Sequence, residues 1–288
     1  MKIVRSDGRV LETRPGGWTV EESKLENWDY FEQEITTAAN VLTDGSSLVG
    51  KRLGEIDRTA YLAYFGNDKT LLEQQTEAKT FFNPKFTFQV YMTYNGRTRW
   101  VEGELDAFQC ALYKGMMVTE ITFTLLCLDP YWRDADGNDR SLTDAEPMFG
   151  FPFVSILEPN ALRGFNASRL IFDGKNTVYN SGDVPTFYTI KMEFDGEVKN
   201  PSITKDGRTI KILDTMVAGD VVEIDLQSAP PKLTKNGSNA IQLASRDSSF
   251  TGMEMQVGAN IFTYTMDNVE NRSLMHVSIL HHEKYLGV

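Results

Sequence analysis

A short alternation of apolar and polar residues, ended by a tight turn, constrains the fold of this chain more than any other feature. Within residues 85–92, four apolar side chains take every second position: Phe86, Phe88, Val90 and Met92. A period of two is typical of a strand with one buried face. Asn95-Gly96 follows, and both residue types tolerate the positive φ of a two-residue hairpin turn. The sequence therefore predicts an antiparallel hairpin that returns over residues 98–105.

Strand patterns outnumber helical ones in the rest of the chain. One helix is predicted over residues 69–80, capped by Asp68 and ended by Asn83-Pro84. Aromatic and β-branched residues, which favour pleated surfaces, are frequent elsewhere. Strands are predicted over residues 56–65, 118–128, 187–194, 209–211, 221–226, 253–257, 260–266 and 274–281. A mostly β fold follows.

The first 50 residues are less decisive. Residues 1–20 favour a hairpin or an extended arm, broken by Pro15-Gly16-Gly17. Residues 21–47 are acidic and leave two alternatives open, a long excursion or a helical piece over residues 25–39. We therefore describe residues 1–50 as an arm or extension and assign no function to them.

A change in composition after residue 132 indicates a domain boundary. Residues 133–140 are highly charged, and a segment with three prolines follows, Pro147, Pro152 and Pro159. Such segments commonly link domains. We therefore predict one domain over residues 1–140 and a second over residues 141–288. The short strands and regular turns of the second domain are typical of a β-sandwich.

The acidic charge restricts the partners that we expect. The formal net charge is −11, the chain holds 40 Asp and Glu residues, and both halves are acidic. Duplex nucleic acid and anionic membranes attract basic patches, so neither is expected as a stable partner. The N-terminal residues lack the apolar region of a secretory signal, and no run approaches the roughly 18 apolar residues of a membrane span.

Histidine and cysteine suggest no metal or catalytic site. The three histidines are His276, His281 and His282, and adjacent residues on a strand point to opposite faces. Cys110 and Cys127 lie in apolar strand-like segments, where we expect small buried side chains rather than a disulfide. No cofactor and no metal are predicted.

Carboxylates give two further candidate sites, and neither pattern is specific. Residues 134–138 resemble the start of a calcium loop but lack the later Gly and Glu, which favours a solvated linker. Pairs two residues apart, such as Glu102/Glu104 and Glu193/Asp195, are compatible with a glycoside hydrolase. Among 40 acidic residues such pairs arise by chance, so we predict no catalytic residue and no enzyme.

Three passages together carry a resemblance to a known family. They are the hairpin over residues 86–104, the strand Ile121 to Leu128 that ends in Asp129-Pro130-Tyr131-Trp132, and Asn180-Ser181-Gly182-Asp183-Val184-Pro185 with the segments 200–203 and 219–225 after it. The ending Tyr285-Leu286-Gly287-Val288 also fits. In this order the sequence resembles, over residues 56–288, the distal tail proteins of long-tailed bacteriophages, prophages and phage-tail-like particles.

The resemblance implies a fold and a structural role. It implies an N-terminal β-sandwich with a helix and an extended hairpin that closes into a hexameric ring, and a galectin-like C-terminal β-sandwich outside it. It implies a place at the virion tail tip, synthesis in the host cytoplasm, and contacts with the tail tube protein and tail-tip proteins. Some relatives also hold a receptor-binding protein or touch host cell-wall saccharides. The ring leaves a channel for DNA, and we hypothesise that an acidic lumen lets DNA slide without sticking.

Four residues are candidates for subunit interfaces. Asn95, Arg97 and Arg99 surround the predicted hairpin turn, from which they can reach a neighbouring subunit. Trp132 is expected to anchor packing at the domain boundary, with an interface contact as the alternative.

A carbohydrate-binding module is the alternative function, and a glycoside hydrolase with two carboxylates is a third. A lectin-like module needs an exposed aromatic ring on which a sugar can stack. Tyr179, Tyr188 and Tyr264 are the candidates in the second half of the chain.

Overall fold

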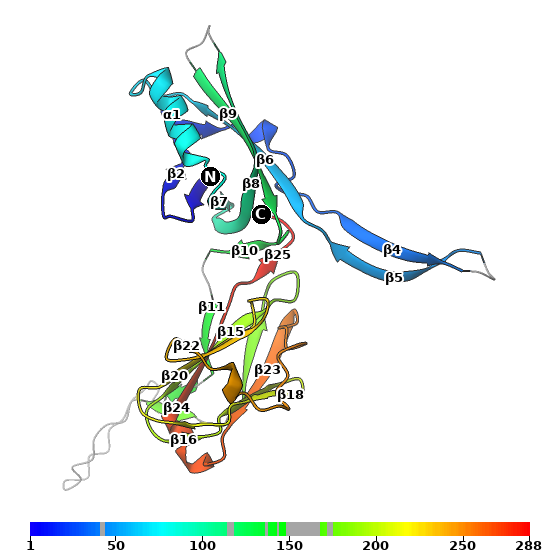
Figure 1. The fold of residues 1–288 in the computed structure, drawn as a ribbon, viewed down its shortest axis with the longest axis vertical. Coiled ribbons are helices and arrows are strands. Elements are labelled where there is room, and N and C mark those ends of the chain that lie inside the picture. The colour runs from blue at the N-terminus through cyan, green and yellow to red at the C-terminus, as the bar shows by residue number, and fades with distance from the viewer. Residues whose placement is uncertain (41–43, 114–117, 136–137, 143, 148–167, 172–174) are drawn as a thin grey trace, which may run out of the picture. The chain divides into compact units, whose positions relative to one another are not determined.

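The computed structural model describes the chain except residues 41–43, 114–117, 136–137, 143, 148–167 and 172–174 (Figure 1). The chain divides into two compact units. Unit 1 comprises Met1–Ala135 together with Lys284–Val288, and unit 2 comprises Asp136–Glu283. The prediction placed a single boundary after residue 140 and did not include the return of the chain end to unit 1. The described part is mostly strand with one small α-helix, which confirms the predicted fold class.

One antiparallel sheet forms the framework of unit 1. Its main path runs β2-β1-β7-β8-β9-β6-β3, and β10 joins both β8 and β25 off this path. The nine strands are β1 (Lys2–Arg5), β2 (Val10–Glu12), β3 (Trp18–Val20), β6 (Ile56–Tyr64), β7 (Thr87–Tyr94), β8 (Arg97–Tyr113), β9 (Val118–Cys127), β10 (Trp132–Asp134) and β25 (Lys284–Tyr285).

The β7–β8 hairpin confirms the strongest sequence prediction. Tyr94 pairs with Arg97, and the turn residues Asn95 and Gly96 have φ values of 49° and 77°. Strand β9 also alternates strictly, and its inward residues Ile121 and Phe123 are buried. The apolar positions of these strands therefore set their register, because a shift by one residue would turn the apolar face to solvent.

Helix α1 (Leu71–Phe81) covers part of this core with a narrow face that includes Ala78 and Phe81. Its cap differs from the prediction. Thr70 Oγ1 accepts from the Glu73 backbone N–H, and Glu73 bonds back to the Thr70 backbone N–H as a capping box. Asp68 instead accepts a hydrogen bond from the Tyr64 hydroxyl. The predicted Asp68 cap is wrong because the side chain of Asp68 is already engaged before the helix begins.

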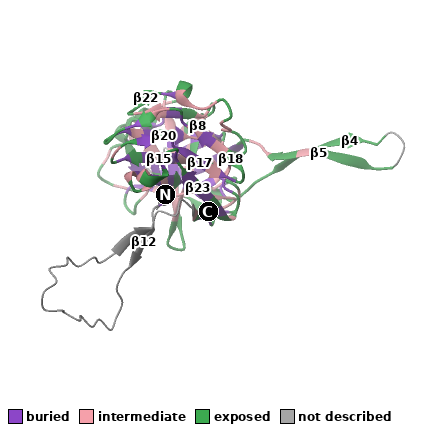
Figure 2. Ribbon diagram, turned by 90° about the horizontal axis from the view of Figure 1, so that it is seen from below, coloured by how far each residue is buried: buried purple, intermediate pink, exposed green. Residues whose placement is uncertain are grey.

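The acidic N-terminal segment forms a long ribbon. After the short 3-10 helix η1 (Glu22–Lys24), β4 (Gln33–Ala39) pairs only with β5 (Ser46–Leu53). The ribbon runs outward from the sheet of unit 1 and is exposed along its length (Figures 1 and 2). The long excursion is thus confirmed, and the alternative helix over residues 25–39 is wrong. We call β4–β5 the arm.

Unit 2 consists of two main sheets whose inner faces share one core. Ile190 and Met192 of one sheet and Ile203 and Phe262 of the other belong to the same buried cluster. The six-stranded sheet follows the order β11 (Asn138–Ser141), β24 (Met275–His281), β15 (Tyr188–Phe194), β20 (Val221–Asp225), β21 (Lys232–Lys235) and β22 (Ser238–Asn239). The four-stranded sheet follows the order β14 (Lys175–Asn180), β23 (Gly258–Thr265), β17 (Ser202–Lys205) and β18 (Arg208–Lys211).

Smaller elements complete unit 2. They are the strand pairs β12 (Asp144–Pro147) with β13 (Ser168–Ile171) and β16 (Val198–Lys199) with β19 (Thr215–Met216), and the 3-10 helices η2 (Ile241–Leu243) and η3 (Val269–Leu274).

One predicted strand of unit 2 is absent. Met253 and Met255 are buried, as their alternation suggests, but residues 253–257 form only an isolated bridge from Met255 to Thr186. Gly252 and Gly258 on either side have positive φ values of 68° and 93°. These turns bend the chain at both ends and leave too few residues for a strand.

Candidate assembly surfaces

The four residues predicted for interfaces have different environments. Asn95 and Arg97 are exposed at the tip of the β7–β8 hairpin. Arg99 Nη1 donates to the Gly287 carbonyl at 2.5 Å, and its guanidinium lies 3.6 Å from the centre of the Tyr285 ring. Arg99 therefore holds the last residues of the chain within unit 1.

Trp132 lies inside unit 1 with no exposed surface. Its indole Nε1 donates to the Trp28 carbonyl at 3.1 Å, and the Arg58 guanidinium lies 5.0 Å from the ring centre. Arg58 is itself fully buried and donates to three carbonyls, those of Asn27, Trp28 and Pro130. The segment that ends in Trp132 thus serves the packing of unit 1.

Asp129 ties the returning chain end to this segment. Its Oδ2 atom lies 2.8 Å from both Arg133 Nη2 and Lys284 Nζ. Burial alone would raise the pKa of Asp129, but the Lys284 ammonium and the Arg133 guanidinium outweigh it and hold the pKa below its ordinary value. Because the carboxylate form is favoured in the folded state, Asp129 stabilises unit 1 whenever it is ionised.

Replacing Asp129 by asparagine is expected to lower the free energy of unfolding of unit 1 by about 1–2 kcal/mol at pH 7. The stabilisation is fully present above the unfolded-state pKa of about 3.9 and is lost as the pH falls through the depressed folded-state pKa. The difference between wild type and variant should therefore vanish only in strong acid. Urea unfolding at several pH values measures it, with the exposed Asp57→Asn as control; equal effects of both variants would contradict the clamp.

The aliphatic side chains of Ile35 and Leu48 lie on one face of the arm, which we call its apolar face although Lys51 shares it. Ile35 and Leu48, each 61% exposed, fall on one face because Ile35 pairs with Lys51, Thr37 pairs with Leu48 and opposed residues share a face. The other face carries the Glu34–Arg52 ion pair, with 2.6 Å between Oε2 and Nε. Such a division is typical of a strand pair that buries one face, yet this face is uncovered in a single chain.

None of the interface residues chosen from the sequence lies on the arm, although the sequence contains a hairpin signal there. Asp44-Gly45, a common hairpin turn, separates two short segments with isolated apolar residues, and Gly45 has a φ of 96°. The weak alternation obscured it, since a bulge between Thr36 and Thr37 shifts the pairing by one residue.

Acidic side chains follow the outer face of β8. Glu102, Glu104 and Asp106 are exposed. Glu102 accepts from Gln89 Nε2 at 3.1 Å and Glu104 accepts from Thr87 Oγ1 at 3.0 Å, and neither forms an ion pair within the described residues. This face therefore carries uncompensated negative charge.

The Asn180–Pro185 passage is a structural turn between β14 and β15 of unit 2. Asn180 is 1% exposed, its Nδ2 donates to the carbonyls of Val184 and Met255, and its Oδ1 accepts from the Gly182 N–H. The Ser181 N–H donates to Glu283 Oε1 at 3.1 Å. These bonds join the turn to Met255 and to Glu283, the last residue of unit 2.

Only one of the three tyrosines considered for sugar stacking is suitably placed. Tyr188 and Tyr264 are buried, because alternation along β15 and β23 directs them inward, so these two candidates are wrong. Tyr179 is 65% exposed on β14. Its strand neighbours on the same face include the exposed Thr177 and, on β23, Ile261.

The remaining candidate sites hold no grouped metal ligands in the part of the chain that is described. His276 Nε2 lies 2.9 Å from Asp195 Oδ2, an ordinary surface pair. Of the calcium-loop-like residues 134–138, positions 136 and 137 lie outside the described residues, as do Pro152 and Pro159. No helix in the described ranges has the length and apolar character that a membrane crossing requires.

Solved structures share this fold along nearly the whole chain. The crystal structure of the SPP1 Dit (gp 19.1) protein, called a paradigm of hub adsorption apparatus in phages that infect Gram-positive bacteria, aligns with a TM-score of 0.64, 13% identity and 98% of both chains covered. A chain of the phage P2 baseplate in its activated conformation with Ca aligns with a TM-score of 0.58, 9% identity and 100% and 99% coverage. The strontium form of that baseplate gives 0.55, 10% and 97% of both chains. No curated protein matches the sequence.

A family model matches most of unit 2. Residues 181–285 match the siphovirus-type tail component, C-terminal domain. Unit 2 therefore carries the C-terminal domain of a siphovirus-type tail component. The matched region begins within the Asn180–Pro185 turn and covers most of unit 2, so the passage that carried the resemblance is part of the distal tail protein domain. Together with the shared fold, this domain supports a structural role in a phage tail or baseplate.

Proposed function

We propose that this chain is a distal tail protein that forms a homo-hexameric ring at the tail tip or baseplate, joins the tail tube to the tip proteins, and leaves a channel for DNA. Its role in this proposal is structural and involves no catalysis. The exposed two-faced arm is the observation that carries it. The fold shared with a phage hub protein and with a baseplate chain supports the same location.

The arm supports self-assembly because a single chain gives it no stabilising neighbour. An isolated two-stranded ribbon is marginally stable in water, and packing of an apolar face is what usually holds one in place. Ile35, Leu48 and Val49 are each more than 60% exposed on the arm. A surface that projects from one copy and is covered on another makes a heterologous contact, and such contacts form a ring when the rotation between successive copies closes.

The acidic outer face of β8 supports a channel lining. Glu102, Glu104 and Asp106 would repel phosphate groups at short range, and DNA would then pass without the counterion release that stabilises binding. A ring whose lumen is strongly basic would contradict this part of the proposal.

Light scattering of the purified chain across concentration tests the ring. We expect a hexamer, or two stacked hexamers. Leu48→Lys on the apolar face of the arm should weaken association by about 2 kcal/mol per interface, roughly 30-fold. Thr36→Lys on the polar face is the matched control and should assemble as wild type does. Equal masses for wild type and Leu48→Lys would show that the arm does not hold the ring together.

Saccharide binding by unit 2 is a second candidate function, favoured by Tyr179 alone. An exposed aromatic ring on a sheet face beside threonine hydroxyls suits stacking and hydrogen bonding to a sugar. Tyr179→Ala should abolish sedimentation of the protein with host cell walls, whereas Tyr94→Ala, also 65% exposed but in unit 1, should not. Binding that survives Tyr179→Ala would remove this candidate.

A further inference from the structure

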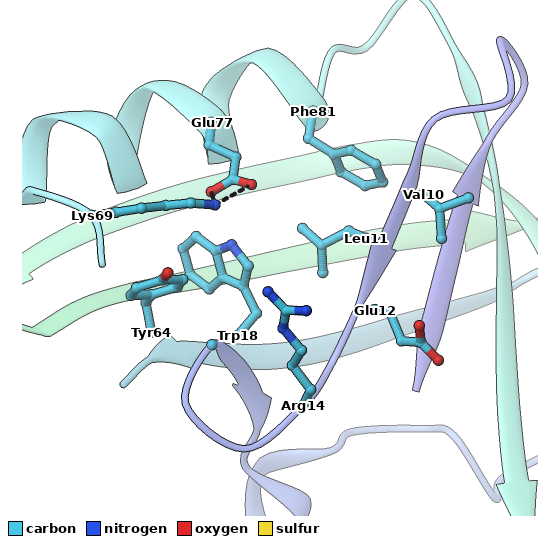
Figure 3. A pocket seen from close by; sticks show the side chains of 10 residues that line it. Val10, Leu11, Glu12, Arg14, Trp18, Tyr64, Lys69, Glu77 and Phe81 are labelled. Atoms are coloured by element: carbon cyan, nitrogen blue, oxygen red, sulfur yellow. Dashed lines mark hydrogen bonds and ion pairs between the residues drawn. The ribbon is translucent and has the colours of Figure 1, made fainter. Parts of the chain in front are cut away.

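A cavity of about 360 Å³ lies beside the edge of the unit 1 sheet (Figure 3). Its walls come from β2, the segment that leads into β3, the end of β6 and helix α1; they include Val10, Leu11, Arg14, Trp18, Glu77 and Phe81. The volume far exceeds the roughly 30 Å³ that one water takes in the liquid. The cavity is therefore large enough for side chains of another segment.

The cavity contains an unsatisfied polar group. Trp18 is 4% exposed, and its indole Nε1 has no hydrogen-bond partner within the described residues. Figure 3 shows the indole nitrogen turned toward the interior of the cavity, on the side of Leu11 and Glu77. Glu77 is held by Lys69, with 2.7 Å between Oε2 and Nζ, and does not accept a hydrogen bond from the Trp18 indole. Buried donors are almost always paired, so this N–H indicates an acceptor supplied from outside.

The adjoining strand β2 offers a free backbone edge. It is the terminal strand of the sheet path and pairs only with β1. The Arg5 N–H donates to the Arg9 carbonyl and the Thr13 N–H to the Met1 carbonyl, which places Leu11 in the hydrogen-bonded register with β1. Val10 and Glu12 therefore turn their N–H and C=O groups away from β1, where an added strand can bind them.

We propose that the arm of a second copy pairs with the β2 edge and inserts an aliphatic side chain into this cavity, with a backbone carbonyl accepting from Trp18. This inference rests on the proposed ring and names the surface that receives the arm. The arm is itself a strand pair, so it has the backbone conformation that the edge requires. Its aliphatic side chains can pack against Leu11 and Phe81, the apolar part of a wall that also carries Arg14 and Glu77.

The distribution of exposed apolar side chains singles out the arm as the occupant. Among the described residues of unit 1, six such side chains are at least 61% exposed: Ile35, Leu48, Val49, Leu72, Tyr94 and Leu128. Half of them lie on the arm. A strand of seven residues spans about 24 Å, enough to cross a neighbouring domain. Donor and acceptor surfaces differ, which is the condition for a head-to-tail ring.

Two variants separate the donor from the acceptor. Val10→Pro removes an N–H that is not bonded to β1, a position where an edge strand tolerates proline, and so blocks strand addition while the fold is kept. Val10→Thr keeps the N–H and is the control. Ile35→Lys combined with Leu48→Lys removes the aliphatic side chains that would pack against Leu11 and Phe81, and leaves β2 intact.

The test is the mass of each variant and of their mixture, measured by light scattering. Each variant alone should be a monomer, and Val10→Thr should assemble as wild type. Mixing should give a 1:1 dimer and nothing larger, because only one intact arm and one intact edge remain. If the Val10→Pro chain still forms the wild-type ring, the β2 edge is not where the arm binds, although the ring itself is confirmed. If both variants are monomeric and do not combine on mixing, the arm does not bind the β2 edge, since β2 then contacts another partner. If the wild-type chain stays monomeric, both the proposed ring and the proposed binding of the arm to the β2 edge are wrong.

Discussion

Replacing Trp132 by alanine is expected to remove about 3–5 kcal/mol from the free energy of unfolding of unit 1. The side chain has no exposed surface, packs against Trp28 at 6.0 Å between ring centres, and donates to the Trp28 carbonyl. A cavity of that size cannot be refilled, because Arg58 on the other face of the ring is fixed by its own hydrogen bonds. The loss is a large fraction of the roughly 5–15 kcal/mol that stabilises a typical domain, so the alanine variant should unfold at a clearly lower urea concentration than wild type.

Urea unfolding followed by tryptophan fluorescence measures this effect in unit 1 alone, because the four tryptophans are Trp18, Trp28, Trp100 and Trp132. Trp132→Phe keeps an aromatic ring and should lose clearly less than the alanine variant. An alanine variant within 1 kcal/mol of wild type would show that the surroundings collapse around the site and that Trp132 is not the anchor of this region.

Replacing Arg58 by methionine is expected to destabilise unit 1 by about 3–5 kcal/mol. Methionine has a similar length but no donors, so the carbonyls of Asn27 and Pro130 would lose buried partners. Burial lowers the pKa of Arg58, yet the guanidinium stays protonated in proteins, and the three carbonyls and the Trp132 ring are what solvate the charge. The same fluorescence measurement applies.

Arg97→Met, at an exposed position of the neighbouring hairpin, is the control and should change stability by no more than about 0.5 kcal/mol. Because Arg58 and Trp132 are in contact, the double variant Arg58→Met/Trp132→Phe should lose less than the two single variants combined. Strict additivity would mean that the two side chains stabilise unit 1 independently. It would contradict the view that they form one cluster.

The sequence alone determined most of the strands and the fold class. Alternation in β7, β9 and β23 requires one face to be buried, and the Asn95-Gly96 turn fixes which strands pair. The family resemblance rested on the same local features, and the match over residues 181–285 falls on one of its passages. Such features can be recognised without the tertiary structure, because hydrophobic periodicity and turn preferences depend on residues that are close in sequence.

The sequence left open which surfaces take part in assembly. Arg99 was a candidate interface residue, yet its guanidinium holds Gly287, a residue 188 positions later. Tyr188 and Tyr264 were candidates for an exposed site and proved to be buried. Pairings between distant segments depend on how the sheets close, and no local pattern encodes them.

Tertiary structure alone decided the arm, the cavity and the return of the chain end to unit 1. The arm buries nothing within its own chain, so its sequence shows little of the alternation that burial imposes. The orphaned Trp18 N–H appears only when the surrounding groups are placed, since any one of them might have satisfied it. Lys284 meets Asp129 across 155 residues, and only the folded sheet brings these charges together. Local preferences thus fixed the strands, whereas contacts between distant segments fixed which surfaces a partner can reach.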